Sequence, residues 1–195
     1  MLRLRRHLER EGFDTWSTTY PSRRMGVADL ARTVAERIRT ELPRRDLFAV
    51  THSLGGILVR QMADTLPIRR VVMLAPPNGG SRLARTMRAS PLFQWFYGPA
   101  GSEVADGAPW PTPRAPFAVI AGTRAASIAN PTSWLRAFPA DVPNDGTVSV
   151  EETRLEGMTA FATVDATHTW IMDHPEARAR VVEFLRTVDA RSFER

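Results

Sequence analysis

The strongest constraint on the fold lies in Val50–Gly56, which reads Val-Thr-His-Ser-Leu-Gly-Gly. A short apolar run, Leu47–Val50, precedes the serine, and a run with helical spacing, Leu54–Leu66, follows it. A strand, a sharp turn with a central serine, and then a helix form the geometry of a nucleophile elbow, whose strained bend exposes the serine hydroxyl. The two glycines let the helix begin close behind the strand, whereas Thr51 stands where the usual pattern has its first glycine.

Strand-like and helix-like segments alternate along most of the chain. Apolar runs predict strands at residues 13–20, 47–50, 70–74, 117–121 and 161–164, and apolar residues at helical spacing predict helices near residues 4–12, 27–42, 54–66 and 177–188. This alternation predicts an α/β fold, with a mainly parallel sheet and helices on both faces. A chain of 195 residues fits one domain, residues 1–195.

Residues 81–115 depart from the alternation, because they are rich in proline, glycine and aromatic residues and show no strand period. One interpretation is a packed excursion over the core. The other is a cap over Ser53, in which the aromatic residues supply an apolar acyl pocket; these residues are Phe93, Trp95, Phe96, Tyr97 and Trp110. Large insertions without regular structure often form active-site lids, which favours the cap.

A serine hydroxyl is a weak nucleophile at neutral pH and needs a base beside it. Of the four histidines, His7 lies among arginines in the first predicted helix, and His174 stands at the start of the last one, as a cap would. His52 adjoins the serine, but we expect its side chain to point away, as a packing or hydrogen-bonding residue. His168 follows the last predicted strand, where the base arrives in this architecture, with His174 as the alternative.

The base in turn needs a carboxylate to orient it. Asp145 lies in Asn144–Val148, where Asn-Asp-Gly is also an ordinary turn sequence. Its position gives the chain order serine, aspartate, histidine, which favours it over Asp141 and Asp165.

The oxyanion of a tetrahedral intermediate needs two backbone N–H donors. The residue after the nucleophile supplies one, here Leu54, at a helix N-terminus whose dipole favours negative charge. The second donor normally comes from a loop after an earlier strand, often marked His-Gly, and no such loop is recognisable in this sequence.

Composition limits the partners. The absence of cysteine excludes disulfides and thiolate metal sites. The net charge is +5 and the 26 lysine-plus-arginine residues are all arginine, but they are interspersed with acidic residues along helices. That pattern indicates solvated helix faces, so we expect no nucleic-acid partner. No apolar run approaches the ~20 residues of a membrane span, and the charged first residues favour a cytoplasmic protein.

Five motifs occur in the order seen in lipase-like α/β-hydrolases of bacteria, which the chain resembles from Met1 to about Leu185. The motifs are Thr51–Gly56, Ala75–Ser81, Ile120–Thr123, Asn144–Val148 and His168. The resemblance implies a triad of Ser53, Asp145 and His168 that hydrolyses carboxylic esters or lipids with no cofactor and no metal.

The resemblance also implies a strand that this sequence does not contain. The family fold places it between the strands predicted at 13–20 and 47–50, and ends it in the His-Gly loop. Met1 falls inside the helix that should follow. Because a missing central strand leaves unpaired backbone groups on both sides, we expect Met1 to be an internal methionine of a longer chain. If Met1 is the native start, residues 13–20 could pair directly with residues 47–50.

Two functions agree with these observations. The first is a serine esterase or lipase that cleaves a small-molecule or lipid ester through an acyl-enzyme, with acyl transfer as a near variant. The second is a catalytically silent or truncated hydrolase-like domain with a binding role, which the missing strand favours.

Overall fold

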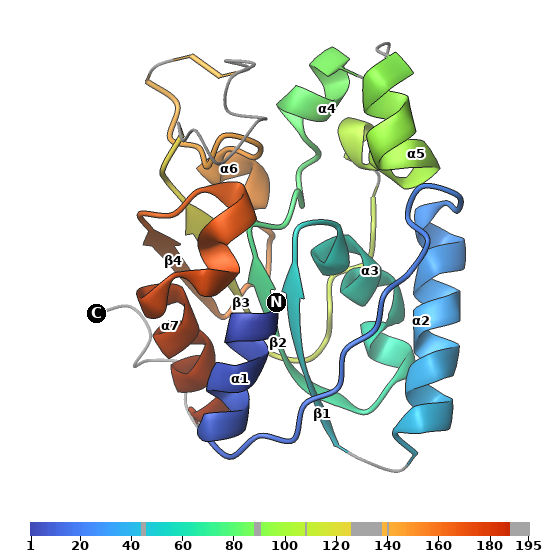
Figure 1. The fold of residues 1–195 in the computed structure, drawn as a ribbon, viewed down its shortest axis with the longest axis vertical. Coiled ribbons are helices and arrows are strands. Elements are labelled where there is room, and N and C mark those ends of the chain that lie inside the picture. Colours follow the sequence, from blue (N-terminus) through green and yellow to red (C-terminus); the bar gives the residue numbers. More distant parts are fainter. Residues whose placement is uncertain (44–45, 88–90, 108, 126–137, 140, 188–195) are drawn as a thin grey trace.

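The computed structural model describes residues 1–43, 46–87, 91–107, 109–125, 138–139 and 141–187, with side chains described for all of these except 91–97 and 106. Within these residues the chain forms a four-stranded sheet flanked by helices (Figure 1). The strands lie in the order β1 (Leu47–His52), β2 (Ile68–Leu74), β3 (Phe117–Gly122) and β4 (Ala160–Val164). Every pairing is parallel, so all four carboxyl ends meet at one edge of the sheet.

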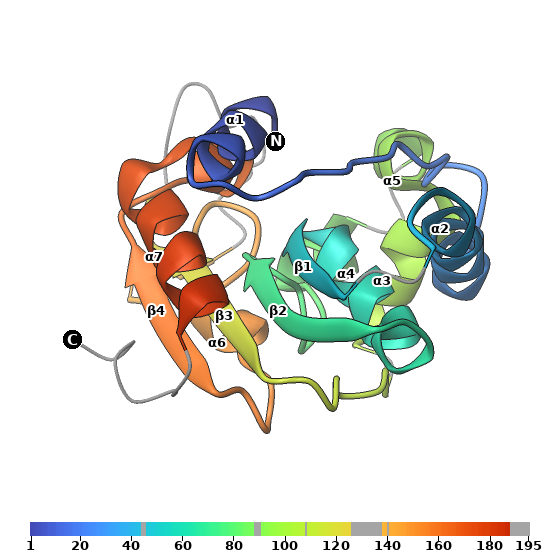
Figure 2. The same ribbon diagram turned by 90° about the horizontal axis from the view of Figure 1, so that it is seen from below.

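Helices cover both faces of the sheet, as predicted (Figure 2). α1, η3 and α7 lie over one face, and α2 and α3 lie over the other. The helical elements, with η for 3-10 turns, are α1 (Leu2–Arg10), α2 (Val27–Glu41), α3 (Leu54–Met62), η1 (Ala63–Thr65), α4 (Arg82–Met87), α5 (Pro91–Asp106), α6 (Val150–Thr153), η3 (His168–Asp173) and α7 (Pro175–Arg186).

The central strand β2 shows why both faces are covered. Val71, Val72, Met73 and Leu74 are all fully buried, which is the pattern of a parallel strand packed on both sides. Because side chains alternate along a strand, Val72 and Leu74 belong to the cluster with α1 and α7, whereas Val71 and Met73 belong to the cluster with α2 and α3. The strand predicted at residues 70–74 is therefore confirmed, and so are the helices predicted on the two faces of the sheet.

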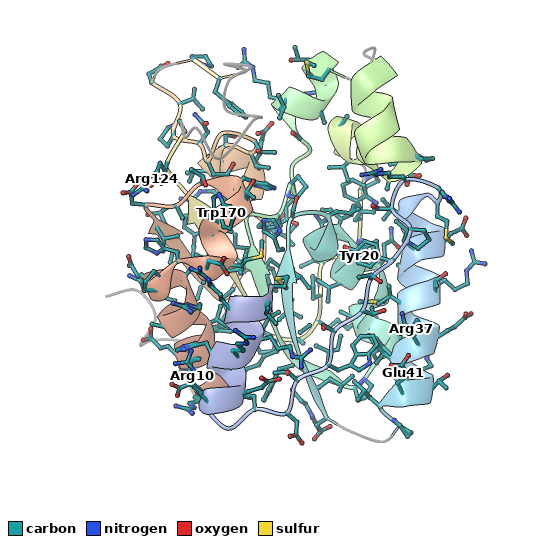
Figure 3. All side chains as sticks on the ribbon, in the orientation of Figure 1. Arg10, Tyr20, Arg37, Glu41, Arg124 and Trp170 are labelled. Carbon is teal, nitrogen blue, oxygen red and sulfur yellow. The ribbon has the colours of Figure 1, made fainter. Side chains whose placement is uncertain are left out.

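Residues 13–20 do not form the predicted strand. They run extended past α2 without a ladder, and side chains make the hydrogen bonds that join them to α2. The Trp16 indole N–H donates to Glu41 Oε2 at 2.6 Å, and Arg37 donates to the Thr18 hydroxyl. Figure 3 labels Arg37 and Glu41 on α2, with Tyr20 nearby on the extended segment. The prediction failed because no neighbouring strand lies beside this segment in the described part of the chain.

β1 is consequently an edge strand, paired only with β2 among the described residues. It extends to His52, two residues past the predicted end, and it is less buried than expected of a core strand. Phe48 is 46% exposed. Direct pairing of residues 13–20 with β1, the arrangement expected if Met1 is the native start, is not observed.

In the described part of residues 81–115, the helices α4 and α5 lie beyond the carboxyl ends of the strands (upper part of Figure 1). Gly98, with φ 60°, interrupts α5 just before Pro99. Trp110 is buried in a cluster with α2, α3 and the end of α5, whereas the side chains of Phe93, Trp95, Phe96 and Tyr97 lie outside the described set. None of the helices in the described ranges combines the length and hydropathy that a bilayer span requires.

Candidate active site

Ser53 occupies a strained turn between β1 and α3. Its backbone has φ 51° and ψ −123°, a region that costs a residue with a side chain about 1–3 kcal/mol. Two hydrogen bonds hold it there: the Ser53 N–H donates to the Leu74 carbonyl at 2.9 Å, and the Ser53 carbonyl accepts from the Gly56 N–H at 2.8 Å. The predicted strand, sharp turn and helix are therefore all present.

Gly56 explains how the helix can start so close to the sheet. A Cβ at this position would lie 2.7 Å from the Pro76 Cβ, in the loop that follows β2. A Cβ at Gly55 would meet its nearest neighbour, the Thr51 Cβ, at 3.4 Å, which is an ordinary contact. Of the two glycines, Gly56 is the one whose missing side chain sets the approach of α3 to the sheet.

His168 reaches the serine from the far edge of the sheet. It is the first residue of η3, after β4, and its Nε2 lies 2.9 Å from Ser53 Oγ. Its Nδ1 lies 2.7 Å from Asp145 Oδ2. A carboxylate oxygen only accepts, so Nδ1 carries the proton, and the Nε2 lone pair faces the serine hydroxyl. The three side chains form one continuous hydrogen-bonded chain.

Asp145 is fully buried, and both of its carboxylate oxygens accept hydrogen bonds. While Oδ2 accepts from His168, Oδ1 accepts from the backbone N–H groups of Thr147 at 2.9 Å and Val148 at 2.8 Å. The Asp145 carbonyl also accepts from the His168 N–H at 2.9 Å. Gly122, at the end of β3, makes room for this turn, because a Cβ there would lie 2.8 Å from the Asp145 Cβ.

A cavity of about 100 Å³ opens beside Ser53. Its walls come from the Ser53 turn, from the loop after β2, from α4 and α5, from the turn that carries Asp145, and from the segment before α2. They are mostly apolar, with four residues that carry hydroxyl groups, Ser22, Ser53, Ser81 and Thr147. The lining residues are Ser22, Ser53, Leu54, Pro77, Ser81, Leu83, Ala84, Gly101, Val104, Thr147 and Val148.

Comparison with known proteins identifies the fold. No protein-family model and no curated protein matches the chain, but solved structures do. A Bacillus licheniformis lipase in its mature form aligns with a TM-score of 0.73 and 19% identity, over 95% of this chain and 84% of that one. The chain has an α/β-hydrolase fold.

Two further solved structures that align with this chain are of larger proteins. A phospholipase from Legionella pneumophila aligns with a TM-score of 0.68 and 17% identity, over 96% of this chain and 56% of that one. A metagenomic carboxyl esterase aligns with a TM-score of 0.64 and 22% identity, over 86% of this chain and 58% of that one. The chain thus spans little more than half the length of these two proteins.

Within this α/β-hydrolase fold, the competing acids and bases lie elsewhere. Asp165 is exposed and pairs with Arg124 at 2.5 Å; that hydrogen bond lowers the pKa of Asp165 (Arg124 is labelled in Figure 3). Asp141 is exposed as well. His174 is the N-cap residue of α7, as predicted by position, although its side chain makes no capping hydrogen bond. His7 lies on α1. The structure therefore brings His168 and Asp145, and not these residues, to Ser53.

His52 is the hydrogen-bonding residue that the sequence suggested, and its partner is the base itself. Its Nε2 lies 2.9 Å from the His168 carbonyl oxygen, and the two ring centroids are 4.9 Å apart. The carbonyl only accepts, so the His52 Nε2 carries a proton. Burial, together with the nearby His168, lowers the pKa of His52 to about 3, so the ring is neutral at ordinary pH.

Sequence reasoning missed Arg60, a buried cation on α3 that is only 6% exposed. Its guanidinium donates to the carbonyls of Trp110 at 2.6 Å, Pro111 at 2.9 Å and Asn78 at 3.2 Å. Burial lowers its pKa to about 10. Arg60 therefore ties the helix behind Ser53 to two loops, one of which carries Pro77 and Ser81 of the cavity. The sequence signal that could have indicated its burial is its position directly after the apolar Ile57–Val59.

Proposed function

We propose that this chain is a serine hydrolase of carboxylic esters, an esterase or lipase, with Ser53 as nucleophile, His168 as base and Asp145 as the orienting acid. The observation that carries the proposal is the unbroken hydrogen-bond chain from the buried Asp145 carboxylate through His168 to Ser53 Oγ. The strained Ser53 turn supports it, because a nucleophile elbow presents its hydroxyl in this way. The neighbours' names, lipase, phospholipase and carboxyl esterase, agree with an ester substrate.

The geometry supplies each proton transfer. Ser53 Oγ attacks the ester carbonyl carbon while its proton passes to His168 Nε2. The imidazolium, stabilised by the Asp145 carboxylate, then gives that proton to the leaving alcohol oxygen, and an acyl-enzyme remains on Ser53. A water molecule attacks the acyl carbon as His168 removes its proton; the carboxylic acid departs, and the proton returns to Ser53. No step calls for a cofactor.

Leu54 is the residue that we assign to the oxyanion. It is the first residue of α3, and the N–H groups of a helix's first turn have no acceptor within their own helix. Its N–H follows Ser53 directly in the chain and would donate to the oxyanion, and the positive end of the helix dipole adds to the stabilisation. We assign no residue to the second donor.

The cavity and the segment 81–115 complete the proposal. Leu54, Leu83 and Val104 give the cavity apolar walls that suit an acyl group. α4 and α5 contribute part of these walls from beyond the carboxyl ends of the strands, so we propose that residues 81–115 act as a cap over Ser53. A small-molecule or lipid ester would enter beneath it.

Hydrolysis of p-nitrophenyl esters of graded acyl length tests the function. Wild-type protein should hydrolyse at least one ester, Ser53→Ala should lose at least about 10³-fold in kcat, and Ser17→Ala should match the wild type because Ser17 is an exposed serine far along the chain from the site. Folded wild-type protein with no activity toward any ester would favour the alternative, a catalytically silent domain with a binding role. Equal activity in Ser53→Ala and wild type would exclude the proposed nucleophile.

A further inference from the structure

Ser53 and His168 come from opposite edges of the sheet. In the sheet that the described residues form, β1 and β4 are the two edge strands, with β2 and β3 between them, so no ladder bond joins β1 to β4 directly. The Ser53–His168 side-chain hydrogen bond cannot fix this spacing throughout the reaction, because its proton is transferred when the serine attacks. A separate connection is needed if the two loops are to keep their distance during turnover.

His52 provides such a connection. It is bonded covalently to Ser53, and its Nε2–H donates to the His168 carbonyl at 2.9 Å. The N–H of His168 donates to the Asp145 carbonyl, also at 2.9 Å. Both backbone polar groups of His168 are thus hydrogen-bonded: its N–H to the Asp145 turn, and its carbonyl to the residue before Ser53.

We propose that His52 is a positioning residue, whose Nε2–H holds the His168 carbonyl and so sets the distance between the nucleophile and the base independently of the hydrogen bond that transfers the proton. This inference rests on the proposed serine hydrolase function. His52 itself touches neither the substrate nor the transferred proton in this scheme.

The protonation state of His52 suits this role. A neutral imidazole with its hydrogen on Nε2 makes the bond to the carbonyl without adding charge near the base. The ring centroids of His52 and His168 are only 4.9 Å apart, so a second cation here would oppose formation of the His168 imidazolium. The low pKa of His52, about 3, keeps the ring neutral while His168 cycles.

Two substitutions separate the hydrogen bond from mere packing. His52→Gln keeps a donor, because the glutamine Nε2 reaches about as far from the backbone as the histidine Nε2 does. His52→Leu keeps an apolar side chain of similar bulk and removes the donor. Steady-state kinetics on the best p-nitrophenyl ester should be measured for both, with kcat normalised to the fraction of chains that a fluorophosphonate titrates, so that misfolded protein does not count.

We expect His52→Leu to lower kcat by about 10–100-fold with KM changed by less than about twofold, since small displacements of catalytic groups cost up to about 10²-fold. His52→Gln should recover to within about fivefold of the wild type, and His7→Leu, a histidine change on α1, should leave both constants unchanged. If His52→Leu does not fold, His52→Asn, whose shorter amide cannot reach the carbonyl, should show the same loss.

Three results would overturn the role of His52 while leaving the proposed function intact. These are a kcat for His52→Leu within twofold of the wild type, an equal loss in His52→Gln and His52→Leu, and a loss confined to KM. If wild-type protein neither hydrolyses esters nor reacts with the fluorophosphonate, the proposed function fails, and the role of His52 fails with it.

Discussion

Replacing Asp145 with asparagine should invert the tautomer of His168. Asp145 Oδ1 accepts two backbone N–H groups, from Thr147 and Val148. In the variant only the amide oxygen can take that place, so the amide NH₂ must face His168 Nδ1. Because that NH₂ group only donates, Nδ1 must become the acceptor and the ring proton must move to Nε2. Nε2 can then no longer remove the proton of Ser53.

The expected loss of rate follows because His168 can no longer act as a base, while the packing around residue 145 is kept. We expect kcat to fall by about 10³–10⁴, a barrier increase of about 4–5.5 kcal/mol at 1.36 kcal/mol per tenfold change in rate. Since asparagine has the same shape and keeps both backbone hydrogen bonds, the free energy of unfolding should fall by no more than about 2 kcal/mol. The loss of rate should therefore greatly exceed the loss of stability.

The assay is ester hydrolysis at neutral pH, together with urea unfolding of the same preparation. Asp165→Asn is the matched control, because this aspartate is exposed and pairs with Arg124 on the surface. Such surface pairs contribute about 0–1 kcal/mol to the free energy of unfolding. Because Asp165 also lies outside the hydrogen-bonded chain to Ser53, the kcat of this variant should stay within about twofold of the wild type. A folded Asp145→Asn protein that keeps more than a tenth of the wild-type kcat would refute the tautomer argument.

The remaining predictions concern stability, measured by urea unfolding. Gly56→Ala should cost about 1–3 kcal/mol, because its Cβ would lie 2.7 Å from a proline carbon. Gly55→Ala, whose Cβ would make an ordinary contact at 3.4 Å, should instead stabilise the fold by up to about 1 kcal/mol through helix propensity, and it thus controls for that effect. Arg60→Met should lower the free energy of unfolding by at least about 2 kcal/mol, because buried carbonyls lose a charged donor. The control Arg39→Met, on the exposed side of α2, should lower it by under about 0.5 kcal/mol. Equal losses in the two variants would contradict the structural role of Arg60. The folded pKa of His52 lies below its ordinary value of 6.5, so the unfolded chain takes up a proton first as the pH falls. Between pH 6.5 and about 3, this residue should therefore remove up to about 1.4 kcal/mol of stability per pH unit. His52→Gln should show a shallower decline, and parallel curves would contradict the assignment.

Most of the fold was predictable because its signals are local. The apolar run of β2 and the helical spacing of α2 each report burial through neighbouring residues in the sequence. Residues 13–20 show where this reasoning fails. A strand requires a partner, and an extended, partly apolar segment looks the same in sequence whether its partner is a strand or the side chains of a helix such as α2.

The candidate site divides in the same way. Ser53, Asp145 and His168 were accessible from sequence, because the Ser53 turn has a local pattern and the order of the three along the chain limits the choices. The bond from His52 to the His168 carbonyl joins residues 116 positions apart, and no local pattern encodes it. Arg60 likewise binds carbonyls of loops some 50 residues away, so only the fold discloses its partners.

The central claim is that one hydroxyl, Ser53 Oγ, is made nucleophilic by His168. Reaction with a fluorophosphonate, which forms a bond from the serine oxygen to phosphorus and expels fluoride, tests it most directly when the modified peptide is identified by mass spectrometry. We predict one adduct per wild-type chain, on the peptide that contains Ser53, with none in Ser53→Ala and a rate reduced by at least about 10³-fold in His168→Ala. An adduct that persists in Ser53→Ala, or folded wild-type protein that stays unmodified, would contradict the account.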